Sequence, residues 1–105
     1  MLVHEVQVPS PDETDEAKLA NVSLSVHTEP KDAAGIFTRA NPRLAVYSHI
    51  IPPDVTETQL RAATQYSGPL TVAHDLMMIT IGDQITVTDR PRAQAQSFET
   101  SGAIR

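Results

Sequence analysis

The sequence predicts an α/β fold, a mixed β-sheet on which two main helices pack. Three observations lead to it. A short continuous apolar run at 44–47 is typical of a strand covered on both faces. The segments on either side of this run, 28–42 and 56–66, carry apolar residues at helical spacing between helix start and stop signals. Strand-like runs lie at 2–8 and between 70 and 87. Strands that alternate with helices form a sheet with helices packed on it.

The first 27 residues predict a strand, a loop and a second extended segment. Three valines stand among polar residues at 2–8, and Pro-Ser-Pro at 9–11 ends this strand. The acidic stretch that ends at Glu16 is expected to be a solvated loop. Apolar residues alternate with Ser23 and Ser25, which predicts a half-buried strand or extended approach within 17–26. This segment leads to His27.

The middle of the chain predicts a helix followed by a buried strand. Thr28 is the expected N-cap, Pro30 lies in the first turn, and the helical apolar face ends before Pro42. The buried strand follows at 44–47, with His49 at its end.

The second main helix begins with a capping box, Thr56 and Gln59, and its apolar face carries Leu60, Ala63 and Tyr66. Ser-Gly-Pro at 67–69 stops it. Segments 70–73 and 76–81 are predicted strands, and a two-residue turn at 82–83 predicts a hairpin. We expect a partial domain over 1–88 and a flexible tail over 89–105, where large apolar residues are nearly absent.

Composition limits the classes of function. The chain has 105 residues, about one small domain, and no cysteine, so a metal would be held by imidazole and carboxylate groups. Such ligands suit Zn²⁺, Mn²⁺ or Fe²⁺. The net charge of −5 and the scattered arginines argue against a nucleic-acid partner. No apolar run reaches membrane-spanning length and no targeting segment is evident, so we expect a cytoplasmic protein without a membrane partner.

The candidate functional residues are the two histidines that flank the first main helix. In an α/β protein, residues at the carboxyl ends of strands and in the loops before helices meet in a shared crevice. His27 precedes the helix and His49 follows the buried strand, so both imidazoles are expected at that crevice. This arrangement indicates a metal-assisted hydrolase.

Four segments carry a resemblance to a known family. They are Leu2-Val3-His4-Glu5, His27-Thr28-Glu29-Pro30 with Ala33-Ala34-Gly35, Asn41-Pro42-Arg43-Leu44-Ala45-Val46-Tyr47-Ser48-His49, and Tyr66-Ser67-Gly68-Pro69 with Val72-Ala73-His74-Asp75-Leu76-Met77. Over residues 1–88 the chain resembles the C-terminal part of metallo-β-lactamase-fold hydrolases of the ribonuclease Z and arylsulfatase-like branch. The resemblance implies the C-terminal half of an αββα sandwich.

The resemblance also implies roles for individual residues. His49 matches the last histidine ligand of a dinuclear metal centre, His27 the histidine that assists proton transfer to the leaving group, and Glu5 the carboxylate that orients it. His4 and Asp75 are further candidates as groups that hydrogen-bond to a ligating histidine. The family's His-x-His-x-Asp-His cluster is absent from this sequence. We therefore expect a C-terminal segment that is incomplete alone. By itself the chain is expected to offer one metal ligand, His49, and either to bind a metal weakly through it or to bind none.

Each candidate also has a structural interpretation. His49 can simply end a buried strand, and His27 can hydrogen-bond to backbone at a helix start. Glu5 can be a solvated carboxylate, His4 can pack or face solvent, and Asp75 can form a turn.

Two functions from different classes follow. The first is a dinuclear-metal hydrolase segment that acts on an ester, phosphodiester or sulfate ester through a metal-bound hydroxide. A small-molecule ester is favoured as substrate, while transfer RNA follows from the resemblance without support from the charge. Its partner would be a second copy in a homo-oligomer or the missing N-terminal half. The alternative is a catalytically silent α/β module for interaction or oligomerisation.

Overall fold

The computed structural model describes residues 1–89 of a small α/β protein. The chain divides into two units, Met1–Val72 and a second that begins at Ala73. Of the tail expected over 89–105, all but Asp89 lies outside the described residues.

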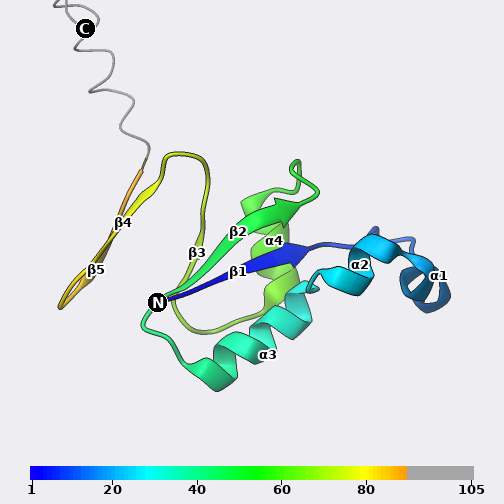
Figure 1. Ribbon diagram of the computed structural model, residues 1–105, viewed down its shortest axis with the longest axis horizontal. Helices are drawn as coiled ribbons and strands as arrows, with labels where there is room; N and C mark the ends of the chain where they lie inside the picture. The colour runs from blue at the N-terminus through cyan, green and yellow to red at the C-terminus, as the bar shows by residue number, and fades with distance from the viewer. Residues whose placement is uncertain (90–105) are drawn as a thin grey trace, which may run out of the picture. The chain divides into compact units, whose positions relative to one another are not determined.

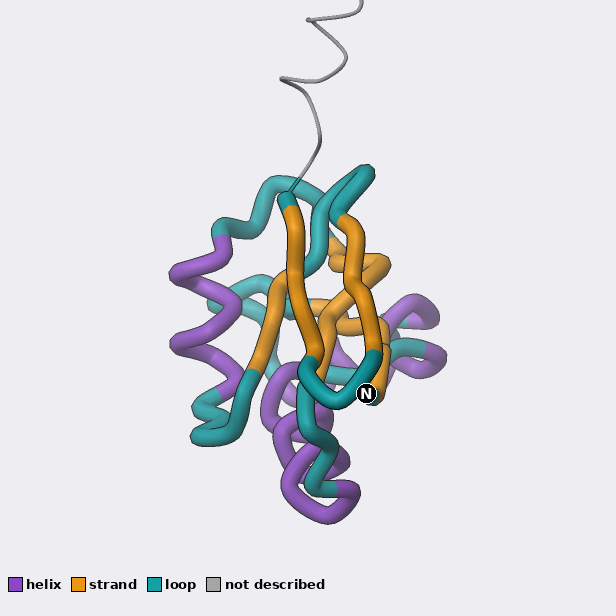
Figure 2. The backbone as a smooth tube through the Cα atoms, turned by 90° about the vertical axis from the view of Figure 1, so that its left-hand side faces the viewer, coloured by secondary structure: helices purple, strands orange, loops and turns teal. Residues whose placement is uncertain are grey.

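The first unit is a parallel sheet with helical connections (Figure 1). Its elements are β1 (Leu2–Gln7), α1 (Asp15–Ala20), α2 (Val22–Val26), α3 (Pro30–Ala40), β2 (Ala45–Ile51), α4 (Glu57–Thr64) and β3 (Leu70–Val72). The strands lie in the order β1-β2-β3, and both pairings are parallel. The connections can be followed in Figure 1 and from the side in Figure 2. Both crossovers step in the same direction along the sheet, and right-handed crossovers of that kind place α3 and α4 on one face. The two helices pack against each other, as this requires.

The strand register decides which side chains enter the core. His4, Tyr47 and Val72 are paired neighbours across the three strands. Tyr47 is fully buried and its hydroxyl lies 2.9 Å from Thr64 Oγ1 in α4, so this row faces the helices. The core consists of buried residues from β1, α3, β2 and α4, namely Val6, Ala33, Phe37, Ala45, Tyr47 and Leu60. Two of these core residues are aromatic, Phe37 and Tyr47, and their ring centroids lie 5.5 Å apart.

The segment at 17–26 is helical, so the prediction of a strand or extended approach there is wrong. The Thr14 side chain accepts a hydrogen bond from Ala17 N and begins α1, and Asn21 accepts from the backbone of Ser23 and Leu24 and begins α2. These local caps satisfy backbone donors that a strand would direct to a neighbour. The loop predicted up to Glu16 therefore ends two residues early.

The two main helices were predicted well. Helix α3 begins with Pro30 at its first position, but its N-cap is Glu29 rather than Thr28. Helix α4 has the predicted reciprocal capping box between Thr56 and Gln59. Its buried face contains Leu60 and Thr64, whereas Ala63 is exposed. The helix ends at Thr64, and Tyr66 beyond it packs against the core with its ring centroid 5.4 Å from that of Phe37.

The second unit contains an antiparallel hairpin within its described part, 73–89. Strands β4 (Met78–Ile81) and β5 (Ile85–Thr88) pair with each other, and Ile81 opposite Ile85 leaves a loop of three residues instead of the predicted two. A turn closed by a hydrogen bond from Met77 N to His74 O separates β4 from β3. The described residues thus form two sheets, one parallel and one antiparallel, rather than the single mixed sheet expected.

Candidate functional site

The site begins with an irregularity between the two central strands. His4 pairs with Tyr47, and the next pair is Val6 with Ile50, so one residue of β1 stands opposite two residues of β2. The single residue is Glu5, and the two are Ser48 and His49. A β-bulge of this kind bends the strand locally and turns a side chain away from its regular direction, and such bulges are common beside active sites.

His49 is the residue that accommodates the bulge. Its backbone has φ 52°, in the left-handed region, while it still belongs to β2. The prediction placed His49 at the end of the strand, but the strand continues to Ile51. Left-handed backbone is unfavourable for residues with a Cβ, although histidine tolerates it better than most. The side chain of His49 is exposed.

Glu5 connects β1 to the segment before α3. Its Oε2 atom lies 3.0 Å from His27 Nδ1 and accepts a hydrogen bond of 3.2 Å from Thr28 N. The same segment is joined to β1 by a backbone hydrogen bond of 2.8 Å from Gln7 N to Thr28 O. The position of the His27 imidazole is therefore fixed by both backbone and side-chain contacts.

The surroundings of Glu5 favour its ionised form. Partial burial by itself would raise the pKa of the carboxyl group, but the hydrogen bonds from Thr28 and His27 outweigh it, and the pKa lies below its ordinary value. Glu5 is therefore a carboxylate at neutral pH. Because a carboxylate only accepts hydrogen bonds, the proton in the His27 contact is assigned to Nδ1, and Nε2 is left to act on something else.

The imidazoles of His27 and His49 lie next to each other. Their ring centroids are 5.4 Å apart, and the ring planes are inclined by 63°. The structure thus brings Glu5, His27 and His49 together from three separate segments of the first unit. We call these three residues the carboxylate–histidine cluster. It combines an ionised acceptor, an oriented imidazole and a second, exposed imidazole, which are groups suited to proton transfer and to metal binding.

His4 has a different environment from the cluster histidines. Its Nδ1 atom lies 2.8 Å from Glu5 O and 3.8 Å from Glu5 Oε1, and its ring meets Phe37 edge-on with centroids 6.3 Å apart. The ring packs on α3, as the structural interpretation expected. A role of His4 in support of a metal ligand stays a prediction.

Asp75 belongs to the second unit, where it is exposed in the turn between β3 and β4. The turn interpretation describes this position, and Leu76 after it has φ 67°. The role of Asp75 as a hydrogen-bond acceptor for a metal ligand stays a prediction.

Neither the bulge nor the contact between Thr28 and Glu5 was predicted from the sequence. No local pattern signals a bulge, because the extra residue is defined only by the pairing of β1 with β2. Thr28 was expected as an N-cap, and its backbone instead donates to Glu5. The resemblance, which implies that Glu5 orients His27, is the one signal that pointed to a contact of Glu5 with this segment.

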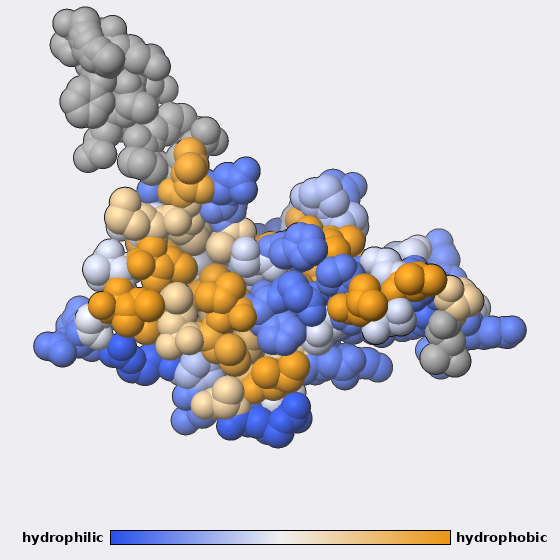
Figure 3. Space-filling view, in the orientation of Figure 1, coloured by the Kyte–Doolittle hydropathy of each residue, from blue (hydrophilic) through white to orange (hydrophobic). Residues whose placement is uncertain are grey.

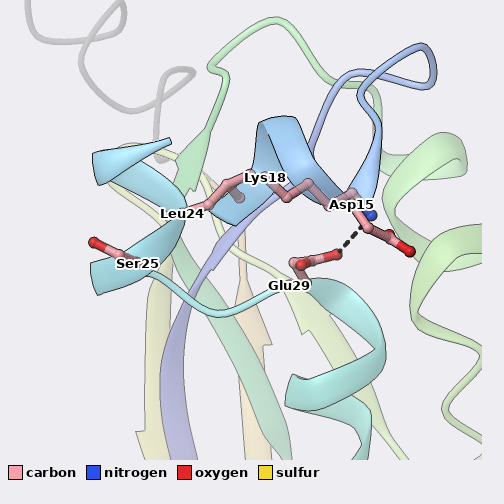
Figure 4. Close-up of a pocket in the computed structure, with 5 residues that line it drawn as sticks. All are labelled: Asp15, Lys18, Leu24, Ser25 and Glu29. Atoms are coloured by element: carbon pink, nitrogen blue, oxygen red, sulfur yellow. Dashed lines mark ion pairs between the residues drawn. The ribbon is translucent and has the colours of Figure 1, made fainter. Parts of the chain in front are cut away.

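Within residues 1–89, no group of three or more histidine, aspartate or glutamate side chains is arranged to hold a metal ion. A hollow of about 380 Å³ is lined by residues that precede or closely follow His27 in the sequence, namely Asp15, Lys18, Leu24, Ser25 and Glu29 (Figure 4). Lys18 Nζ and Glu29 Oε1 approach to 3.6 Å across it, so its central charges neutralise each other. None of the cluster residues lines this hollow.

Comparison of the chain with models of known protein families and with curated proteins gives no match. In the part of the chain that the structure describes, no helix is both long and apolar enough to cross a membrane.

Proposed function

We propose that the chain is a segment of a metal-dependent hydrolase with the metallo-β-lactamase fold, acting on an ester, phosphodiester or sulfate ester. The observation that supports this function is the assembly of Glu5, His27 and His49 at one place on the parallel sheet, 3.0 Å apart for the first two and 5.4 Å between the two rings. In the family that the sequence resembles, the matching residues work together. The three residues come from a strand, a loop and a bulge that are separated along the sequence.

Each of the three cluster residues has a separate role in the proposed reaction. Bound Zn²⁺, Mn²⁺ or Fe²⁺ would supply an activated hydroxide and polarise the substrate oxygen. His49 is the ligand that this chain contributes. His27, when protonated on both nitrogens, donates the Nε2 proton to the departing oxygen. Glu5 accepts the hydrogen bond from Nδ1 throughout, which keeps the ring aimed and compensates its positive charge.

The remaining metal ligands come from outside residues 1–89, because these residues offer no group of three ligands. A second copy of the chain or an N-terminal half is the proposed source. A small ester is the favoured substrate over transfer RNA, since the net charge is −5 and a phosphate backbone would be repelled.

A second candidate is a silent module that binds a partner. Apolar surface lies over α2, which has no buried residue and whose Val22 and Val26 are 78% and 70% exposed (Figure 3). Exposed aliphatic residues one turn apart on a helix are suited to protein contacts. This candidate predicts no hydrolysis at all.

The test is an assay of the natural polypeptide, purified from its source cells, with added Zn²⁺ or Mn²⁺. Its hydrolysis of three nitrophenyl substrates is measured: an acetate, a phosphodiester and a sulfate. We expect activity on at least one substrate, lost in His49→Ala. In His27→Ala the turnover rate should fall about 100-fold or more, the contribution of a general acid. His74→Ala removes an exposed imidazole of the second unit and is the matched control, expected to keep full activity. Activity on none of the substrates, or unchanged rates in the His27 and His49 variants, would refute the proposal.

A further inference from the structure

We propose that this chain by itself binds one transition-metal ion between the imidazoles of His27 and His49, with Glu5 orienting His27. The proposed hydrolase gives His49 a ligand role and His27 a proton-transfer role. The two-histidine site is a property of the chain without a substrate or a ligand from another chain. An ion held there by His27 Nε2 takes the place of the proton that this nitrogen donates in the proposed hydrolase, so the two roles belong to different states.

The separation of the two rings is the first argument. In a tetrahedral zinc site, the metal lies about 2.0–2.1 Å from each nitrogen, and two imidazoles on the same ion then have ring centroids roughly 5 Å apart. The observed centroid separation is 5.4 Å, with the ring planes inclined by 63°. The observed separation of the rings is therefore close to the one that two imidazoles on one ion require.

The hydrogen bond to Glu5 is the second argument. Metal-ligating histidines commonly donate their other N–H to a carboxylate, which fixes the tautomer and the ring orientation. His27 Nδ1 lies 3.0 Å from Glu5 Oε2, and this contact leaves Nε2 directed at other partners. The backbone of Thr28 holds the same carboxylate oxygen at 3.2 Å, so the orienting group is itself positioned.

Both imidazoles are accessible to an ion from solvent. The His27 side chain is 20% exposed, and His49 is exposed on the bulge. An ion bound between them can complete its coordination with water molecules, so a third protein ligand is not required. Imidazole ligands select Zn²⁺, Ni²⁺ and similar ions over Mg²⁺ and Ca²⁺, which prefer oxygen.

The experiment is titration of the ¹⁵N-labelled full chain with ZnCl₂, followed by imidazole nitrogen resonances and by calorimetry. We expect one ion per chain and selective shifts of His27 Nε2 and of one His49 nitrogen, while His27 Nδ1 keeps its proton. His27→Ala and His49→Ala should each weaken binding at least about tenfold, and Glu5→Ala about 10–100-fold, the usual effect of removing a group that orients a ligand. His74→Ala should bind zinc as the unaltered chain does, and MgCl₂ should produce no shifts.

Several outcomes would overturn the site. These are equal zinc affinity in the unaltered chain and in both variants of the cluster histidines, shifts confined to His4 or His74, or shifts caused equally by MgCl₂. Because an alanine variant can unfold, His27→Gln and His49→Gln are measured beside it, and amide spectra identify the variants that keep the fold. The titration needs no catalysis, so failure of the hydrolase proposal does not affect the two-histidine site. Conversely, absence of zinc binding by the isolated chain would overturn the two-histidine site but not a hydrolase metal site that other ligands complete.

Discussion

The backbone of His49 gives a prediction in which the sign of a stability change depends on a single dihedral angle. His49 has φ 52°, whereas Ser48, the other residue of the bulge, is not among the described residues with positive φ. Glycine adopts the left-handed region without a steric penalty. We therefore expect His49→Gly to be more stable than His49→Ala.

The magnitude follows from two opposing terms. A residue with a Cβ in the left-handed conformation loses about 1–2 kcal/mol, which glycine regains. Glycine in turn raises the conformational entropy of the unfolded chain, which costs about 0.4–1 kcal/mol. The net gain in the free energy of unfolding is about 0.5–1 kcal/mol. For a domain of this size it corresponds to about 2–8 °C in Tm.

The assay is urea unfolding of the two His49 variants, compared with Ser48→Gly and Ser48→Ala as the matched pair. At Ser48 the expected order is reversed, with glycine less stable than alanine by about 0.5–1 kcal/mol, because there glycine only adds entropy to the unfolded chain. If glycine is less stable than alanine by the same amount at both positions, His49 does not have left-handed backbone. The assignment of the bulge that positions its imidazole would then be refuted. Confirmation would mean that the chain retains a strained histidine where glycine is more stable, a common property of functional positions.

Two further predictions concern the carboxylate of the cluster and the buried hydroxyl pair. Because the pKa of Glu5 in the folded chain lies below its ordinary 4.5, the ionised group stabilises the fold above that pH, and the stabilisation is lost as the pH falls through the folded value. The advantage of the unaltered chain over Glu5→Gln in urea unfolding should therefore shrink between pH 6 and about pH 3, and a constant difference would contradict the assigned hydrogen bonds. Thr64 donates to Leu60 O at 2.8 Å and accepts from the buried Tyr47 hydroxyl at 2.9 Å. Thr64→Val should thus cost about 1–3 kcal/mol by leaving that hydroxyl unpaired, and Tyr47→Phe only about 0.5–1.5 kcal/mol; the reverse order in thermal unfolding would show that the pair is not buried as described.

Helix boundaries were predictable where the signal lies within one turn of the chain. Thr56 and Gln59 satisfy each other's backbone through contacts three residues apart, so the sequence alone indicates them. The same kind of signal was present and overlooked at α1, where Thr14 precedes the acidic first turn of Asp15 and Glu16. The apparent alternation at 22–26 misled because Val22 and Val26 are exposed, so their spacing does not reflect burial.

In the candidate site, too, local features were predictable from the sequence and the contacts between distant segments were not. The sequence by itself determined the chemistry that is available, namely two histidines at the ends of predicted elements and a carboxylate in the first predicted strand, together with the absence of thiol ligands. It also determined the α3 and α4 helices and the buried strand β2, because periodicity and capping are local properties. Only the tertiary structure decided that Glu5, His27 and His49 meet. That outcome depends on the pairing of β1 with β2 and on the extra residue in β2. The two strands lie about forty residues apart in the sequence, and neither segment alone contains a pattern that specifies their register.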